Sequence, residues 1–157
     1  MSLRVMLIDD DETELVLSRF VVERCGLPCG GVVPFADARD ALAFLRQDGR
    51  VPVDVILLDI HMPGMDGFGF LDAYRPWHEA HAATAAPVVM LSASNDPADR
   101  ERAFGYASVL GYFGKPLDSQ RALTLTSLLV RRDRREACDV APAATPESGD
   151  GELPRPC

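Results

Sequence analysis

The stretch that decides the fold is VDVILLDIHMPGMDG, residues 53–67. Four consecutive apolar residues, 55–58, are followed directly by one carboxylate, Asp59, and then by a tight loop that contains Pro63 and Gly64. Because ligands of open α/β sheets bind at the carboxyl ends of the strands, an acid at the end of a buried strand predicts a site. The alternative is an ordinary strand-to-helix turn, in which Asp is common as a helix cap.

Strand-like and helix-like patterns alternate outward from this stretch. Apolar runs predict strands at 3–8, 32–35, 53–58, 88–91 and 109–113. Helical spacing predicts helices at 13–24, 38–45 and 119–132, and two further helices that begin at 66 and at 96 or 97. Continuous apolar runs are typical of strands covered on both faces, and crossover helices require parallel pairing. The predicted fold is therefore α/β, a (βα)5 three-layer sandwich with a parallel sheet.

The helical segments also predict which side chains face the sheet. In 13–24 the predicted inner face carries Leu17, Phe20, Val21 and Arg24, and in the next helix it carries Ala38, Ala41, Leu42 and Leu45. Pro76 is expected to interrupt or end the third helix, and the segment 76–87 is interpreted as a loop, with a longer helix or a partner contact as alternatives. A proline in the second strand indicates an edge position.

Composition excludes several classes of function. A formal net charge of −8 argues against a protein that holds nucleic acid through its phosphates, and the arginines in 131–135 are interpreted as a solvated helix end. The four cysteines lack paired C-x-x-C spacing and the three histidines form no convincing ligand set. No apolar run is long enough for membrane insertion and the first residues lack the layout of a signal peptide, so a cytoplasmic protein is expected.

Two regions are expected along the chain. Residues 1–132 are predicted to form one domain, because the alternation of strand and helix patterns spans them. Residues 133–157 are rich in Ala, Pro, Gly and acids, which is typical of a disordered tail.

Chemically useful side chains follow four of the predicted strands. Carboxylates repel one another unless a cation joins them, and oxygen ligands are those that Mg²⁺ prefers. A metal, a carboxylate nucleophile, a hydroxyl and a fixed ammonium are the parts needed for phosphoryl transfer. The residues concerned are Asp9, Asp10 and Asp11 after the first strand, Asp59 after the third, Ser92 after the fourth and Lys115 after the fifth.

These residues lie in motifs that resemble the response-regulator receiver domain of two-component signalling. The matching stretches are LIDDDE at 7–12, LLDIHMPGMDG at 57–67, VVMLSAS at 88–94 and GYFGKPL at 111–117, and the resemblance covers 3–132. This family includes the chemotaxis regulator, which is the standard example of the flavodoxin-like strand order 2-1-3-4-5. The resemblance therefore implies that strand order here.

The resemblance implies a role for each matching residue. Asp59 is similar to the phosphoacceptor of the family. Asp9, Asp10 and the main-chain carbonyl of His61 are then expected to hold Mg²⁺ together with Asp59. Ser92 and Lys115 are expected to bind the phosphoryl group.

The resemblance also implies a switch and a tuned lifetime. Tyr112 occupies the aromatic position whose rotamer follows the Ser92 hydroxyl, and the bond before Pro116 is expected to be cis. His61 and Ser94 lie at positions that border the water which hydrolyses the acyl phosphate, so they are expected to tune its lifetime. An exposed loop histidine without a kinetic role is the alternative for His61.

The predicted function is that of a stand-alone response regulator in a phosphorelay, not an enzyme in its own right. It would take a phosphoryl group from a histidine kinase or a histidine phosphotransfer protein, and its fourth helix, fifth strand and fifth helix would then change for a downstream protein target. One alternative is a receiver fragment of a larger regulator or hybrid kinase. Another is a haloacid-dehalogenase-like phosphatase, because Asp9-x-Asp11-x-Thr13 resembles the first motif of that family.

Overall fold

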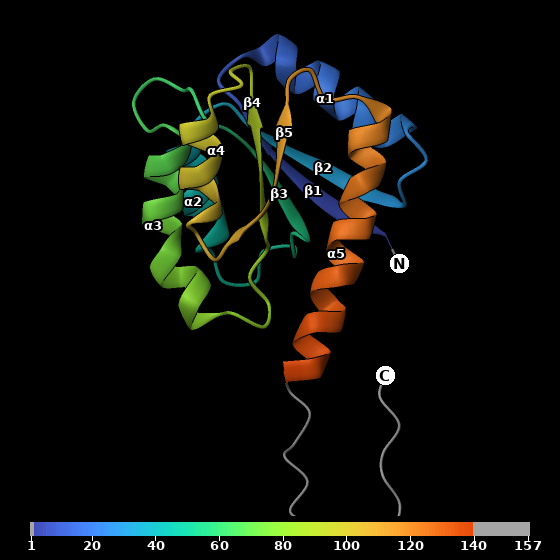
Figure 1. The fold of residues 1–157 in the computed structure, drawn as a ribbon, viewed down its shortest axis with the longest axis vertical. Coiled ribbons are helices and arrows are strands. Elements are labelled where there is room, and N and C mark those ends of the chain that lie inside the picture. The colour runs from blue at the N-terminus through green and yellow to red at the C-terminus, as the bar shows by residue number, and fades with distance from the viewer. Residues whose placement is uncertain (1, 140–157) are drawn as a thin grey trace, which may run out of the picture.

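The computed structural model describes residues 2–139, and residues 1 and 140–157 lie outside the described part of the chain. Five parallel strands form one sheet in the order β2-β1-β3-β4-β5, as predicted. Figure 1 shows the helices covering both faces of this sheet. The elements are β1 Leu3–Ile8, α1 Glu12–Arg24, β2 Cys29–Phe35, α2 Ala38–Leu45, β3 Val55–Asp59, α3 Gly67–Ala80, β4 Val88–Ser92, α4 Pro97–Phe104, β5 Val109–Gly114 and α5 Ser119–Asp139.

The core consists of one apolar cluster on each face of the sheet. Side chains of α2, α3 and α4 pack on one face, and side chains of α1 and α5 pack on the other. Every residue of β3 and β4 is buried, which explains the apolar runs that precede Asp59 and Ser92. The central strands are therefore held from both sides, and their carboxyl ends are fixed at one edge of the sheet.

The predicted inner face of α1 is confirmed only at Val21, which is partly buried against the core. Leu17 and Phe20 are 52% and 54% exposed, whereas Ser18 and Val22 are buried. The face that meets the sheet is offset by one position, with Leu15, Ser18, Val22 and Cys25 at helical spacing. Apolar periodicity finds an apolar stripe on a helix, but the core selects which stripe is covered.

The predicted inner face of α2 is confirmed. Its four apolar positions named above are all buried. Asp37 caps this helix by accepting a hydrogen bond from the backbone N–H of Arg39 at 2.8 Å. The second strand is also an edge strand, as its proline indicates.

Pro76 does not end the third helix. α3 continues through it to Ala80, so the first part of the segment 76–87 is helical rather than a loop. Aromatic stacking explains the continuation, because the ring of Trp77 packs on Tyr74 with centroids 5.7 Å apart and on His81 at 4.3 Å. These contacts compensate for the backbone hydrogen bond that a proline removes.

The last helix is longer than predicted. α5 runs to Asp139, so residues 133–139, which were predicted to belong to the tail, are helical. The rest of the predicted tail, 140–157, lies outside the described residues. Within the described part of the chain, no helix combines the length and the apolar character that crossing a bilayer requires.

Candidate functional site

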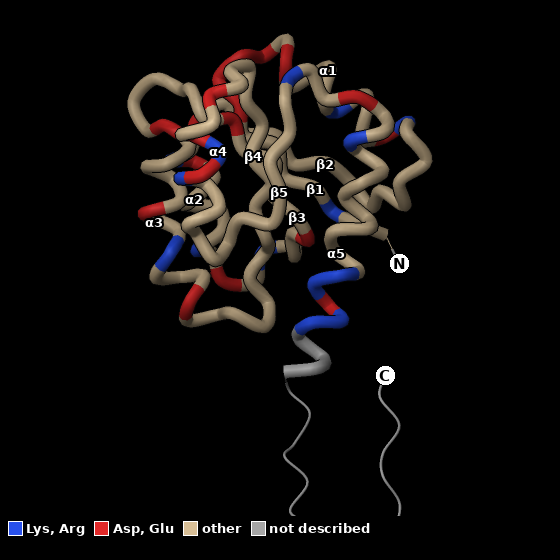
Figure 2. Tube along the Cα trace, viewed as in Figure 1, with Lys and Arg blue, Asp and Glu red and all other residues tan. Residues whose placement is uncertain are grey.

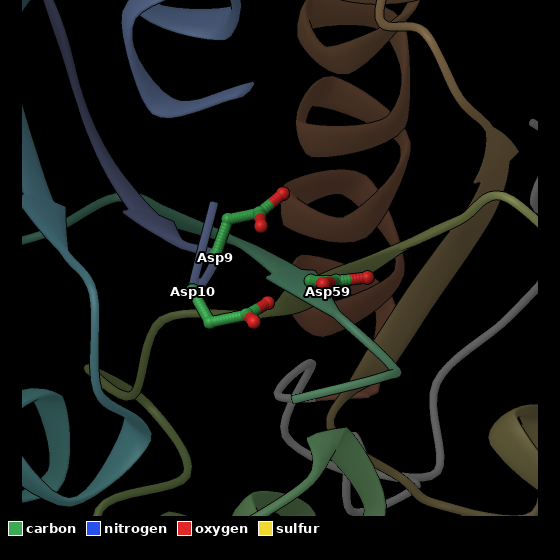
Figure 3. A group of neighbouring side chains, drawn as sticks. All are labelled: Asp9, Asp10 and Asp59. Atoms are coloured by element: carbon green, nitrogen blue, oxygen red, sulfur yellow. The ribbon is translucent and has the colours of Figure 1, made fainter. Parts of the chain in front are cut away.

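Three carboxylates meet at the carboxyl edge of the sheet. Asp9 and Asp10 directly follow β1, and Asp59 is the last residue of the neighbouring strand β3. One oxygen from each of the three carboxylates lies within 4.8 Å of the others (Figure 3). The sequence prediction that these acids converge is thus confirmed, because parallel strands end at the same edge.

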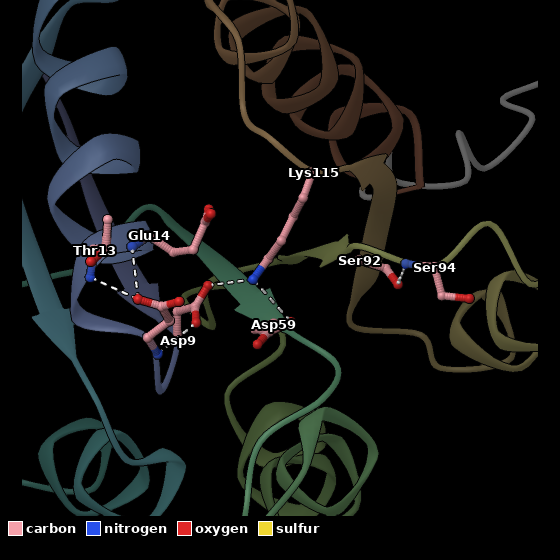
Figure 4. A network of polar contacts seen from close by, with 8 residues as sticks. Asp9, Thr13, Glu14, Asp59, Ser92, Ser94 and Lys115 are labelled. Carbon is pink, nitrogen blue, oxygen red and sulfur yellow. Dashed lines mark hydrogen bonds and ion pairs between the residues drawn. The ribbon is translucent and has the colours of Figure 1, made fainter.

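Lys115 lies between two of these carboxylates. Its Nζ donates to Asp9 Oδ2 at 2.6 Å and lies 3.3 Å from Asp59 Oδ1 (Figure 4). The side chains of the three residues are at most 14% exposed. The ammonium group and the two carboxylates interact strongly, because water screens charges little where they are nearly buried.

The cis peptide bond between Lys115 and Pro116 agrees with the expectation from the resemblance. The backbone N–H of Lys115 donates to the carbonyl of Ser92 at 2.8 Å, which ties the loop after β5 to the end of β4. The lysine therefore starts from a fixed backbone position at the same edge as the acids.

The pKa of Asp59 is raised to about 6 from 3.8, because burial and the charge of Asp9 both disfavour its ionised form. Lys115 and the backbone N–H of His61 oppose this shift. For Lys115, burial lowers the pKa, but hydrogen bonds and charges from Asp9 and Asp59 outweigh it, so the net shift is upward. The site therefore holds more negative charge than its one lysine balances.

The donor set fits a hard divalent cation. The side chains that could act as ligands here are all carboxylates, and a further cation would offset both the burial and the charge of Asp9 that raise the pKa of Asp59. Asp10 is exposed while Asp9 and Asp59 are buried, so the cluster opens to solvent on one side. Mg²⁺ prefers such sites because it keeps several of its waters.

Ser92 lies at the same edge, buried at the end of β4. Its Oγ accepts a hydrogen bond from the backbone N–H of Ser94 at 3.1 Å, and Ser94 Oγ accepts one from the backbone N–H of Asp96 at 3.2 Å (Figure 4). The two hydroxyls thus organise the loop that leads into α4. Within the described residues, neither hydroxyl is hydrogen-bonded to the three acids.

Tyr112 lies on β5, away from the acids. Its hydroxyl is buried without a hydrogen-bond partner, and its ring packs against the core cluster that contains α4. The guanidinium of Arg100 lies 5.8 Å from the ring centroid. A buried phenol without a partner is costly, since such groups normally find one.

His61 extends from the loop after β3 toward α4. Its side chain is 62% exposed, and its Nε2 lies 3.9 Å from Asp99 Oδ2 on α4. The residue thus bridges the acceptor loop and the fourth helix. Sequence reasoning did not find Asp99, because only the fold brings α4 beside this loop.

Gly67, the first residue of α3, is a structural requirement of the site that sequence reasoning missed. A Cβ on this residue would lie 2.6 Å from the carbonyl oxygen of Asp59 and 2.9 Å from Cα of Ile60. Only glycine lets the helix start so close to the acceptor strand. A glycine directly after the helix cap Asp66 was the available signal.

The fold and the edge cluster define an α/β protein with an acidic, lysine-containing site at the ends of its parallel strands. The model of the response regulator receiver domain matches residues 5–127. The chain therefore belongs to the response-regulator receiver-domain family. Magnesium binding and phosphorylation are typical of this family, and its members pair with histidine kinases and phosphotransfer proteins.

Individual proteins agree with this assignment. The chain is 29% identical to the sensor histidine kinase GacS of Pseudomonas protegens over 88% of its length and 15% of the kinase. It is 32% identical to protein-glutamate methylesterase/protein-glutamine glutaminase 5 of Myxococcus xanthus over 98% of its length and 43% of that protein. A two-component response regulator from Cytophaga hutchinsonii superposes with a TM-score of 0.74 at 26% identity, covering 83% of this chain and 99% of the other.

The chain spans less than half of these curated relatives, 15% of one and 43% of the other. The relatives include receivers joined to a kinase and to an esterase. Receiver homology therefore holds for response regulators and for hybrid kinases alike.

Proposed function

We propose that Asp59 accepts a phosphoryl group from a phosphohistidine of a histidine kinase or phosphotransfer protein. The observation that supports this most is the bridge of Lys115 Nζ between Asp9 and Asp59, with Asp10 in the same cluster. It combines a carboxylate nucleophile with a cation that can bind the oxygens of a phosphoryl group. The chain acts as a signalling switch rather than as an enzyme with its own substrate.

In the proposed step an oxygen of Asp59 attacks the phosphorus of the donor. The new O–P bond forms as the P–N bond breaks, and the electron pair of that bond stays on the departing imidazole. Lys115 keeps its contact with Asp9 and binds a phosphoryl oxygen where it now approaches Asp59 at 3.3 Å. With a pKa of about 6, Asp59 is mainly ionised and nucleophilic at neutral pH.

Asp9, Asp10 and Asp59 would hold Mg²⁺ together with the main-chain carbonyl of His61. When bound, the ion neutralises negative charge on the phosphoryl oxygens and on the acids. The carboxylates supply what this chain itself contributes, an all-oxygen donor set with one side open to solvent.

The phosphorylated form would differ at α4, β5 and α5. Ser92 Oγ now accepts from the Ser94 backbone, and a phosphoryl group on Asp59 would offer it an acceptor for its proton. Moving Ser92 toward that group pulls on the loop before α4, a helix in which Ala103 is the buried residue. Tyr112, whose hydroxyl has no partner in this form, would then change rotamer, and a protein target would read the changed face.

His61 and Ser94 are proposed to tune the lifetime of the acyl phosphate. His61 is exposed beside the acceptor loop, and Ser94 lies two residues beyond Ser92. His61→Ala should change the decay rate after the donor is removed by desalting more than it changes the yield of phosphorylation. Equal decay rates for the two proteins would contradict this role.

The phosphodonor is proposed to dock on α1. This helix follows the acids of the site directly, and Val16, Leu17 and Phe20 on it are 67%, 52% and 54% exposed. A donor that brings its phosphohistidine to Asp59 must lie over this edge of the sheet. The exposed apolar side chains supply area that such a protein can bury.

The pathway-level proposals rest on family membership. The chain is proposed to work as a stand-alone cytoplasmic regulator, with a receiver fragment of a larger regulator or hybrid kinase as the alternative. The receiver match over residues 5–127 favours both over the dehalogenase-like phosphatase. No direct contact with nucleic acid is proposed.

Labelling with acetyl phosphate and Mg²⁺, followed by mass spectrometry, tests the acceptor. The chain should gain one phosphoryl group, and Asp59→Asn should abolish this gain. Asp59→Asn is expected to fold, because its side chain keeps nearly the same volume. A phosphoryl group retained in Asp59→Asn and lost in Asp9→Asn would overturn the proposal in favour of the phosphatase.

A further inference from the structure

A basic groove lies at the end of the sheet opposite the acidic site. It consists of two hollows of about 500 and 280 Å³, which share His78, Ala107 and Ser108 among their lining residues. The segment just before β5 lines both hollows, and the last turns of α5 and the end of α3 lie beside it. Since the strands are parallel, their starts are far from the carboxyl edge that holds Asp59.

Arginine is concentrated around this groove. Arg131, Arg132 and Arg135 of α5 line the larger hollow, and Arg75 of α3 lines the smaller one. Glu79 is the acid among the lining residues. Figure 2 shows several positive residues at the described end of α5, with one acid, Asp133 in the sequence, among them, in a chain whose formal net charge is −8.

The groove offers more than charge. Ala82, Leu110 and Leu128 also line the larger hollow. Such a surface fits a peptide that alternates acidic and apolar residues better than it fits an isolated anion, because both kinds of lining are used. The ligand class is therefore an acidic peptide segment with small apolar residues.

The segment of this chain that follows α5 has that composition. Residues 140–157, VAPAATPESGDGELPRPC, hold the acids Glu147, Asp150 and Glu152, one arginine and four prolines. They lie outside the described residues and follow Asp139, the last residue of α5, directly in the sequence.

The attachment point allows the acids to reach the arginines. Glu147 comes eight residues after Asp139, so an extended chain spans about 26–29 Å between them. Arg131 lies eight residues back along α5, which is about 12 Å along the helix. A tethered segment also competes at an effective concentration in the range of about 1 mM, which favours it over free partners.

We propose that residues 140–157 bind in the basic groove of the same molecule, with their three acids facing the arginines of α5 and α3. The bound segment occupies the groove and competes with free partners for it. It does not depend on phosphorylation of Asp59, so it stands or falls separately from the proposed function.

Amide spectra of the ¹⁵N-labelled protein test this proposal. Signals of residues 107–110 should differ between the full chain and a variant that ends at Asp139. A synthetic peptide of residues 140–157 added to the shortened variant should move these signals back toward their positions in the full chain. The peptide with Glu147→Gln, Asp150→Asn and Glu152→Gln should bind at least about tenfold more weakly, because its charge is removed.

Substitutions in the full chain supply the matched comparison. Arg131→Gln with Arg135→Gln should move the signals of residues 107–110 to the positions of the shortened variant. Arg19→Gln with Arg24→Gln makes the same change of charge on α1 and should leave them unmoved. Unchanged amide signals elsewhere in the spectrum of each variant confirm that the domain is folded.

Three results would overturn the proposal. The first is identical signals for residues 107–110 in the full and shortened chains. The second is a difference that grows with protein concentration, which would assign the groove to a second copy. The third is equal binding of the native and the neutralised peptide, which would show that the arginines do not select the segment.

Discussion

Helices α1 and α2 pack on opposite faces of the sheet, and they distribute their apolar side chains in opposite ways. Ala38, Ala41, Leu42 and Leu45 of α2 all face the core. On α1 the buried residues are Ser18 and Val22, while Val16, Leu17 and Phe20 are more than half exposed. The comparison teaches that the core covers the apolar stripe of α2 but not that of α1, and that the acidic site lies beside the helix whose stripe is exposed.

Truncation of one side chain in each stripe is expected to give the largest difference, and that difference is in the free energy of unfolding. Leu42→Ala is expected to lower the free energy of unfolding by about 2–5 kcal/mol, because it removes buried methyl groups and leaves a cavity. Leu17→Ala, the matched change on α1, should alter it by less than about 0.5 kcal/mol, because the side chain is exposed. Urea unfolding followed by the fluorescence of Trp77, the only tryptophan, measures both. Equal losses would break the comparison.

Polar replacement of the α1 stripe should affect transfer from the protein donor alone. Leu17→Ser with Phe20→Ser is expected to reduce the second-order rate of transfer from a phosphorylated kinase or phosphotransfer protein by at least about tenfold, since a few residues buried in an interface carry most of its binding energy. Labelling by acetyl phosphate should not change. Val51→Ser, at a side chain that is 52% exposed far from the site, is the control. A donor rate that stays at the wild-type value would remove α1 from the interface.

Neutralising Asp59 should stabilise the domain without altering either helix. The pKa of Asp59 is about 6 in the folded state, above its ordinary value of 3.8. Between these two pH values the folded state binds more protons than the unfolded chain, so the free energy of unfolding falls as the pH rises. In EDTA at pH 7, Asp59→Asn should therefore be more stable by about 1–2 kcal/mol, allowing for solvent screening at the edge. The gain should vanish near pH 4, and added Mg²⁺ should reduce it. A loss of stability at pH 7 would contradict the assigned cause of the shift.

The polar residue on the inner face of α1 should give the smallest effect. Ser18→Ala is expected to raise the free energy of unfolding by a few tenths of a kcal/mol. Alanine is the better helix former, and the change removes the buried hydroxyl at this position. Thermal unfolding compares the two proteins. A loss above about 1 kcal/mol would mean that the Ser18 hydroxyl stabilises α1, and the contrast with α2 would be weaker.

Most of the fold was predictable because its signals are local. Each strand contains a short, mainly apolar run, and caps such as Asp37 and Asp66 mark where helices start. The failures occurred where neighbours outweigh local rules. Pro76 lies inside α3 because stacked aromatic rings hold the helix together, and the covered stripe of α1 is set by the sheet beneath it.

The candidate site was predictable in its membership but not in its contacts. Asp9, Asp59 and Lys115 each stand at the end of a recognisable strand, so their meeting at one edge followed from parallel pairing. The contact of His61 with Asp99 and the close approach of Gly67 depend on where α3 and α4 pack. No pattern in the sequence encodes those positions.

The sequence by itself determined the succession of strands and helices, the acids at the strand ends and the family motifs, since these depend on neighbouring residues in the chain. Only the tertiary structure decided that three carboxylates lie within 4.8 Å, that Lys115 joins two of them and that the pKa of Asp59 rises to about 6. It also decided that α1 exposes its apolar stripe. The physical reason is that burial and electrostatic coupling arise between residues far apart in sequence, and they exist only once the sheet has assembled.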